Sequence, residues 1–146
     1  MFKHILIPTD GSPVSNKAAR AGIALAVALG GKVTAYYALE DLLPLYVEGY
    51  MIEPTMMADL DRRARELGQK RVDAIGKVAK AAGVRCASLI TKAGTPYEGI
   101  INAAKKQKCD AIFMASHGRR GFSKLMMGSV TQKVLTHSKI PVVVYR

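Results

Sequence analysis

The sequence predicts one α/β domain, a doubly wound, Rossmann-like, five-stranded parallel sheet of order 3-2-1-4-5 with helices on both faces. Five short, β-branched, apolar runs alternate with four helical patterns, which is typical of a parallel sheet whose crossovers are helices. Right-handed crossovers place those helices on both faces of the sheet. The length of 146 residues, with 49% hydrophobic and 23% charged residues, fits a single globular domain over 1–146.

Residues 2–39 predict the first strand–helix–strand unit. Residues 2–8 form a short apolar run closed by proline, which is typical of a buried strand. Asp10-Gly11 indicates a turn, Ser12 is a suitable helix N-cap, and Pro13 occupies the favoured first helical position. Apolar residues at helical spacing then lead to Gly30-Gly31, where a left-handed cap ends the helix. A second strand is expected over 32–39.

The middle of the chain predicts an irregular segment and a long helix. Residues 40–57 are acidic, rich in Tyr and Met, and interrupted by two prolines, so we expect an excursion over the surface. The next helix is expected over 58–82 and ends before Gly83. Its inward face is predicted from apolar residues at helical spacing: Leu60, Ala64, Leu67, Ile75, Val78 and Ala82.

The last third of the chain repeats the alternation. A strand is expected over 84–91, followed by a helix to about residue 107 that opens on a capping box from Thr95 to Glu98. The fourth strand is expected over 110–115. A second capping box, Ser129 to Gln132, opens the last helix, and 139–145 forms the fifth strand.

Charge is the unusual feature of the composition. Lys and Arg total 22 against 11 for Asp and Glu, a net charge of +11. Residues 62–146 hold 18 of the basic side chains and only 4 acidic ones. Such a basic half attracts polyanions such as nucleotide phosphates or nucleic acid, or serves only as a solubilising face. Aromatic residues total 6% and none lies among the arginines, which argues against a nucleic-acid partner.

Several classes of protein are excluded. No apolar stretch approaches the ~18–20 residues of a membrane span. Cys86 and Cys109 lie far apart with no CxxC spacing, which excludes the usual zinc and redox motifs. Pro8 and Asp10 interrupt the first apolar run too early for a signal peptide, so we expect a cytoplasmic protein. No cluster of residues suggests a metal site.

Topology predicts where a ligand binds. In doubly wound sheets, ligands bind beyond the carboxyl ends of the strands, where the strand order reverses. For the order 3-2-1-4-5, this crevice lies between the first and fourth strands. The candidate residues are therefore Pro8, Thr9 and Asp10 after the first strand, and residues 115–118 after the fourth.

The loop after the fourth strand has the features of a phosphate-binding loop. It carries glycines at 118, 121 and 128 and ends where the last helix begins, so backbone N–H groups and the helix dipole face a ligand. The Ser129 hydroxyl either contacts phosphate or caps its own helix. The spacing is neither a Walker A loop nor GxGxxG. Ser116 and His117 are adjacent on an extended loop and expected to point apart, so we assign no catalytic residue.

Three motifs in this order resemble the universal stress protein family, in its branch with a nucleotide-binding motif. Pro8 to Ser12 resembles the family's opening motif, and 139–144 resembles its closing strand. The family's phosphate loop is Gly, two residues, Gly, nine residues, Gly, then Ser or Thr. Here Gly118, Gly128 and Ser129 match it, whereas Ala115 replaces the first glycine. That methyl group could crowd a bound ribose or phosphate.

The resemblance implies a dimeric stress-response regulator that binds ATP, ADP or AMP, with Mg²⁺ beside a triphosphate and at most slow ATP hydrolysis. The homodimer would form through Pro141, Val142, Val143 and Val144. The nucleotide-binding residues that it implies, together with two further residues of the same loop, His117 and Arg119, are Pro8, Thr9, Asp10, Ala38, Met114, Ala115, Gly118, Gly128, Ser129, Val130 and Thr131. The alternative is a dimeric interaction module that binds no nucleotide and acts through partner proteins.

Overall fold

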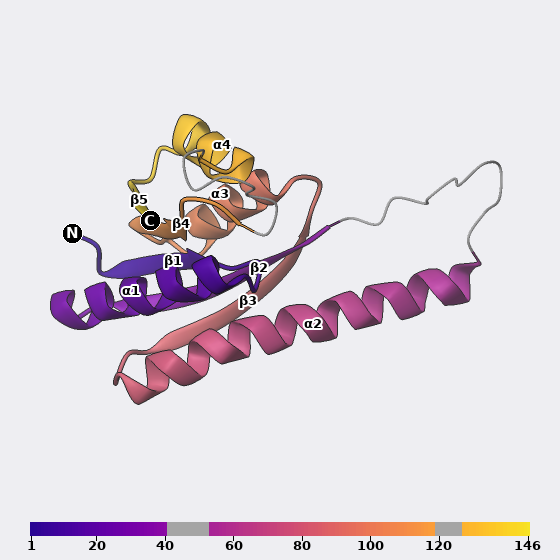
Figure 1. The fold of residues 1–146 in the computed structure, drawn as a ribbon, viewed down its shortest axis with the longest axis horizontal. Coiled ribbons are helices and arrows are strands. Elements are labelled where there is room, and N and C mark those ends of the chain that lie inside the picture. Colours follow the sequence, from indigo (N-terminus) through magenta and orange to yellow (C-terminus); the bar gives the residue numbers. More distant parts are fainter. Residues whose placement is uncertain (41–52, 119–126) are drawn as a thin grey trace.

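A five-stranded parallel sheet forms the centre of the computed structural model, which describes residues 1–40, 53–118 and 127–146. The strand order is β3-β2-β1-β4-β5, as the sequence predicts (Figure 1). The strands are β1 (His4–Pro8), β2 (Lys32–Glu40), β3 (Cys86–Ala93), β4 (Ala111–Ala115) and β5 (Val142–Tyr145). The central strand β1 pairs in parallel with β2 on one side and with β4 on the other.

Two pairs of helices cover the two faces of the sheet. The helices are α1 (Pro13–Leu29), α2 (Pro54–Ala81), α3 (Pro96–Lys106) and α4 (Ser129–His137). Ile5 and Ile7 of β1 pack in one core cluster with residues of α1 and α2. Leu6, between them, belongs to a second cluster with residues of α3 and α4. The alternation of side chains along β1 thus divides the core into two layers, as expected for a doubly wound sheet.

Both ends of α1 form as the sequence predicts. The Ser12 hydroxyl accepts a hydrogen bond from the Ser15 N–H (3.2 Å), which satisfies one of the unpaired donors of the first turn. Gly30 adopts the left-handed conformation, with φ of 58°. Other residues adopt this conformation only at a cost, so glycine ends the helix here.

The prediction for α2 is wrong in its start and only partly right in its inward face, because Ile75 is buried and Val78 packs against the core as predicted, whereas other predicted positions are not buried. The helix begins at Pro54, and its first turns extend beyond the sheet (Figure 1). Leu60 and Leu67 are 38% and 45% exposed. The buried residues are Gly68, Val72, Ile75 and Ala79. A Cβ atom on Gly68 would lie only 2.6 Å from Cδ1 of Tyr37, so the tyrosine ring occupies the space that a side chain at this position would need.

Neither capping box forms. Thr95 is the N-cap of α3, but its hydroxyl donates to the Glu98 carboxylate (2.7 Å) instead of capping the backbone. The N-cap of α4 is Gly128, so Ser129 is the first helical residue and makes no capping hydrogen bond. These boundaries differ because a short polar side chain can bond its neighbours in several ways, and sequence spacing does not choose among them.

Several strands are also shifted or shorter than expected. β1 begins at His4, two residues later than predicted, and β4 begins at Ala111, one residue later. β3 begins at Cys86 and continues to Ala93, two residues further than predicted. β5 begins only at Val142, because Ser138 forms a tight turn before it. The Ser138 hydroxyl accepts from the Ile140 N–H (3.0 Å) and donates to the Ile140 carbonyl (2.8 Å). Pro141 then follows with no N–H to donate to a ladder.

Candidate functional site

The carboxyl ends of β1 and β4 meet at the point where the strand order reverses. From β1 the chain adds β2 and β3 on one side, and β4 and β5 lie on the other. The loops that follow β1 and β4 are in direct contact, because a Cβ atom on Gly118 would collide with Oδ2 of Asp10. The structure therefore brings together the two segments that the topology predicts as a ligand crevice.

The turn after β1 is fixed by its own side chains. Thr9 is buried, and its hydroxyl bonds the Ser15 hydroxyl (2.7 Å) and accepts from the Gly11 N–H (3.0 Å). Oδ1 of Asp10 accepts from the Ser12 N–H (2.9 Å). Gly11 has φ of 78°, a conformation that favours glycine. Asp10 thus shapes the turn with one oxygen, while its other oxygen faces the loop after β4.

The loop after β4 is closed at its base. The Gly128 N–H donates to the Ser116 carbonyl (2.8 Å), which joins the residue before α4 to the residue after β4. A Cβ atom on Gly128 would lie 3.1 Å from Cα of His117, so a larger residue there would push the two ends apart. Arg119 and the glycine at 121 lie outside the described residues.

The N-terminus of α4 lies at this closed base. The first helical hydrogen bond runs from the Gln132 N–H to the Gly128 carbonyl (3.0 Å). The N–H groups of Ser129, Val130 and Thr131 precede that bond and so have no acceptor within the helix. Ser129 is exposed and its hydroxyl makes no capping bond, which removes the capping explanation for this serine. Three N–H donors and the positive end of the helix dipole form an anion-binding arrangement.

Thr131 joins α4 to the end of β4. Its side chain is buried, and its hydroxyl donates to the Ala115 carbonyl (2.9 Å). This hydroxyl is therefore used within the protein. Thr131 can offer a ligand only its backbone N–H.

The remaining predicted residues divide between the two faces of the sheet. Ala38 and Met114 belong to the core layer that α3 and α4 cover, and Pro8 is half-buried at the end of β1. Ala115 belongs to the opposite layer, with residues of α1 and α2. Its methyl group is therefore directed away from the N-terminus of α4. The replacement of glycine by alanine adds to the core on that side.

The prediction that Ser116 and His117 point apart is wrong. The Ser116 hydroxyl and Nδ1 of His117 form a hydrogen bond of 3.0 Å. Because the extended strand ends at Ala115, the two side chains can rotate toward one another. Ser116 is 3% exposed, so its hydroxyl holds the imidazole from the buried side of the ring. This hydrogen bond uses Nδ1 and does not involve Nε2, the other ring nitrogen.

Two residues at the site are missing from the sequence prediction. Ser15 bonds Thr9, as described above. Arg71 of α2 reaches the turn after β1, where its Nε atom would lie 2.5 Å from a Cβ on Gly11. Its Nη1 donates to the Tyr37 hydroxyl (2.8 Å), and its guanidinium lies 5.0 Å from the centre of that ring. No local sequence signal marks Arg71, because its contacts are tertiary and lie 34 residues or more away.

The described residues provide neither a metal cluster nor a membrane-spanning helix. Within residues 1–40, 53–118 and 127–146, no three His, Cys, Asp or Glu side chains are grouped so that they could hold a metal ion. Across the same ranges, no helix combines the length and hydrophobicity needed to cross a membrane.

The fold and the site define a doubly wound α/β domain. Where its strand order reverses, a hydrogen bond from Gly128 closes the loop after β4. The family model of the universal stress protein family matches residues 1–146, and the chain belongs to this family. Universal stress protein MJ0531 of Methanocaldococcus jannaschii is 31% identical over 148 residues, which cover 100% of this chain and 83% of that protein. A universal stress protein of Thermus aquaticus is 32% identical over 146 residues, the full length of both chains.

Solved structures share the fold. MJ0577 of Methanocaldococcus jannaschii superposes with a TM-score of 0.83 at 27% identity and covers 99% of this chain and 95% of its own. A universal stress protein in complex with cAMP has a TM-score of 0.71 at 19% identity, over 99% of this chain and 97% of that one. One from Archaeoglobus fulgidus in complex with dAMP has a TM-score of 0.64 at 17% identity, over all of both chains.

Proposed function

We propose that this chain binds an adenine nucleotide, ATP, ADP or AMP, in the crevice between β1 and β4 and acts as a dimeric stress-response regulator. The observation that carries the proposal is the N-terminus of α4, where three backbone donors and the exposed Ser129 hydroxyl meet a loop closed by Gly128. Helix N-termini of this kind bind phosphate. Two structures with the same fold are complexes with cAMP and dAMP, which supports an adenine nucleotide here.

Each part of the nucleotide has proposed contacts. The nucleoside would lie against the ends of β1, β2 and β4, at Pro8, Thr9, Asp10, Ala38, Met114 and Ala115. The phosphates would accept hydrogen bonds from the first turn of α4, from Ser129 to Thr131, beside Gly118 and Gly128. His117 would present Nε2 to them, and the proposed contact at Arg119 lies outside the described residues. Mg²⁺ would screen a triphosphate, held chiefly by phosphate oxygens and water.

Mass spectrometry of ligand released from the purified protein tests the proposal. We expect close to one adenine nucleotide per chain, or recovery of binding when nucleotide is added to a stripped sample. A chain that carries none and shows no calorimetric binding of ATP, ADP or AMP at millimolar concentration would support the alternative, a dimeric interaction module that acts through partner proteins.

Ser129→Asp tests the phosphate site without disturbing the fold. An acidic residue in the first turn of a helix is favourable, so the variant should fold as well as the wild type. Its carboxylate would repel phosphate at the donors of α4, and we expect affinity to fall at least tenfold. Asn102→Asp adds the same charge on an exposed position of α3 and should leave affinity unchanged. Equal affinities in both variants would remove α4 from the site.

The proposed dimer forms through β5, which is an edge of the sheet. The Ile112 N–H donates to the Pro141 carbonyl (2.9 Å) and the Ser116 N–H to the Tyr145 carbonyl (2.8 Å). Backbone groups alternate along a strand, so those of Val142 and Val144 face away from β4. All four residues of β5 are half-buried, and an apolar edge of this kind readily pairs with a second copy.

Two proline variants test the dimer. Val142→Pro removes an outward N–H and should release folded monomer, whereas Val143→Pro removes a donor to β4 and should destabilise the domain itself. Sedimentation and thermal unfolding distinguish these results. A wild type that is monomeric at micromolar concentration would contradict this assembly.

A cytoplasmic location is part of the proposal, and the free thiols Cys86 and Cys109 are compatible with it.

A further inference from the structure

β3 forms the edge of the sheet opposite β5 and, among the described residues, has β2 as its ladder partner. The Val33 N–H donates to the Arg85 carbonyl (2.9 Å), so the backbone groups of Arg85 and of every second residue after it face β2. The backbone N–H and C=O groups of Cys86, Ser88, Ile90 and Lys92 therefore face away from β2. At eight residues, this edge is long enough to template another strand.

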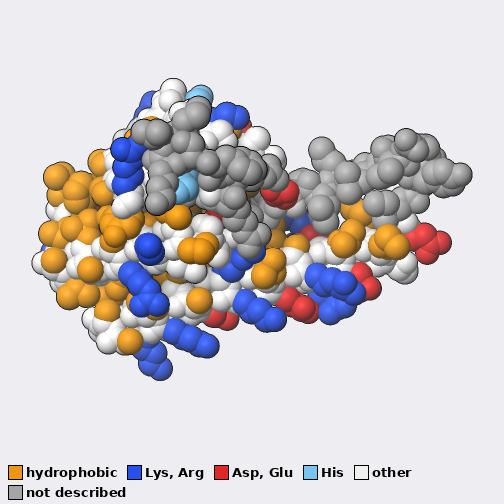
Figure 2. Space-filling model, in the orientation of Figure 1, with side chains coloured by type: hydrophobic (Ala, Val, Ile, Leu, Met, Phe, Trp, Pro, Cys, Tyr) orange, Lys and Arg blue, Asp and Glu red, His pale blue; other side chains and the backbone are white. Residues whose placement is uncertain are grey.

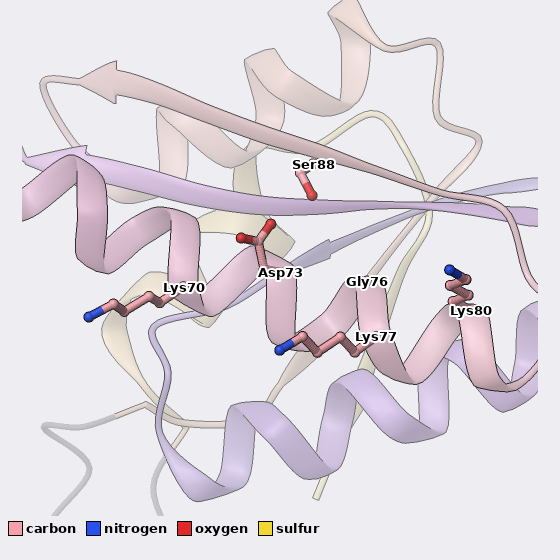
Figure 3. A pocket seen from close by; sticks show the side chains of 6 residues that line it. All are labelled: Lys70, Asp73, Gly76, Lys77, Lys80 and Ser88. Atoms are coloured by element: carbon pink, nitrogen blue, oxygen red, sulfur yellow. The ribbon is translucent and has the colours of Figure 1, made fainter.

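A groove flanks this edge on each face of the sheet. On the α2 face, a groove of about 560 Å³ lies between the helix and β3 and is lined by Lys70, Asp73, Gly76, Lys77, Lys80 and Ser88. Figure 3 shows Asp73 and Lys80 projecting toward β3, while Lys70 and Lys77 extend along the outer rim. On the α3 face, a second groove of about 550 Å³ includes Leu89, Thr91, Gly94, Gly99, Asn102 and Lys106.

The two grooves differ in chemistry. The α2 face presents three lysines and one carboxylate, and that carboxylate, Asp73, already accepts from the Gln69 amide (2.7 Å). The α3 face is partly apolar, and its charged residues are of both signs: its lining includes Leu89, Ala93, Ala103, Lys92, Glu98 and Lys106. In Figure 2, basic side chains follow α2 along its length, and the acidic ones gather toward its N-terminal half.

We propose that the β3 edge binds an extended acidic segment of a partner protein by strand addition. Side chains of an added strand alternate between the two faces, so its acidic residues would meet Lys80 beside β3, with Lys70 and Lys77 at the rim outweighing the charge of Asp73, while aliphatic residues would lie near Leu89. The outward backbone groups of β3 would provide the ladder hydrogen bonds. The same lysines would repel a second copy of this chain at this edge, which is why the partner is a segment of opposite charge.

A heptapeptide of alternating glutamate and valine is the probe, with binding followed by calorimetry and by amide exchange of β3. Two versions are N-methylated, one on the glutamate amides and one on the valine amides. For a strand added in one direction only one set of amides can face β3, and parallel and antiparallel pairing differ in stability, so the two versions should bind with unequal affinity. The amides of Ser88 and Ile90 should become protected. Equal binding of both versions, or no protection, would show simple charge attraction and overturn strand addition.

Charge variants test the basic groove. Lys77→Glu with Lys80→Glu should weaken peptide binding at least tenfold. Lys17→Glu with Lys105→Glu changes the net charge equally on exposed positions outside both grooves and should alter binding less than threefold. Equal losses in both pairs would overturn the proposal. So would an inorganic polyphosphate that binds this edge while the peptide does not, or self-association that Ser88→Pro abolishes.

Discussion

Thr131→Val removes one buried hydroxyl that joins α4 to the end of β4, with little change in shape. The hydroxyl donates to the Ala115 carbonyl at 2.9 Å, and Thr131 is 3% exposed. Valine would leave that carbonyl without this donor in a place closed to solvent. Leaving a buried polar group unsatisfied costs about 1–3 kcal/mol. For a chain of this length, each kcal/mol lowers Tm by about 2–4 °C, so we expect a fall of roughly 5 °C.

Thr131→Ser is the matched control, because it keeps the hydroxyl and loses only the methyl group. Thermal and urea unfolding give the stability of both variants, and calorimetry gives their nucleotide affinity. We expect the serine variant to be the more stable of the two. We also expect the valine variant to bind AMP more weakly, because α4 is then held less firmly over β4. A valine variant as stable as the wild type would refute this role of Thr131.

Two further predictions concern stability away from the site. Gly99→Ala should lower the free energy of unfolding in urea by about 1–2 kcal/mol, because the added Cβ would collide with the buried Tyr36 hydroxyl. This loss should exceed the gain from the better helix propensity of alanine. An unchanged urea midpoint would show that the tyrosine ring moves aside. Burial opposes ionisation of Asp110, but N–H donors from His4 (2.9 Å) and Lys3 (2.8 Å) outweigh it and lower the pKa of the carboxyl. A lowered pKa in the folded state stabilises the protein above the ordinary pKa of Asp, and this contribution is lost as pH falls through the folded value. Asp110→Asn should therefore cost about 1 kcal/mol at pH 7 and progressively less toward pH 3, and a pH-independent difference would contradict this.

The strand order could be predicted because it follows from local signals. Proline and glycine marked the ends of α1, and the alternation of elements determined the topology. The inward face of α2 could be predicted only in part, because Ile75 is buried as its spacing indicates but Leu60 and Leu67 are exposed. Gly68 packs there because Tyr37, 31 positions away, fills the space of a side chain. Leu67 looks like a core residue in the sequence, yet it lies beside that contact and remains exposed.

In the candidate site, too, local sequence signals predicted some features and tertiary packing determined others. The glycines at 118 and 128 were predicted as openings for a ligand, and the structure adds that each also admits a protein neighbour, Asp10 and His117 respectively. Gly128→Leu would therefore disturb the loop as well as any bound phosphate, whereas Ser129→Asp adds a charge at an exposed position of the same helix N-terminus. The contact of Arg71 with the turn at Gly11 depends on the packing of α2 against the sheet, so no local sequence motif predicts it.

Amide chemical-shift mapping with AMP and ATP tests the central claim most directly, because it locates the ligand as well as detecting it. We expect saturable shifts concentrated at Thr9 to Gly11 and at Gly128 to Thr131, with the largest changes for the first-turn amides of α4. Shifts elsewhere on the molecule, or none at millimolar nucleotide, would contradict a nucleotide site between β1 and β4.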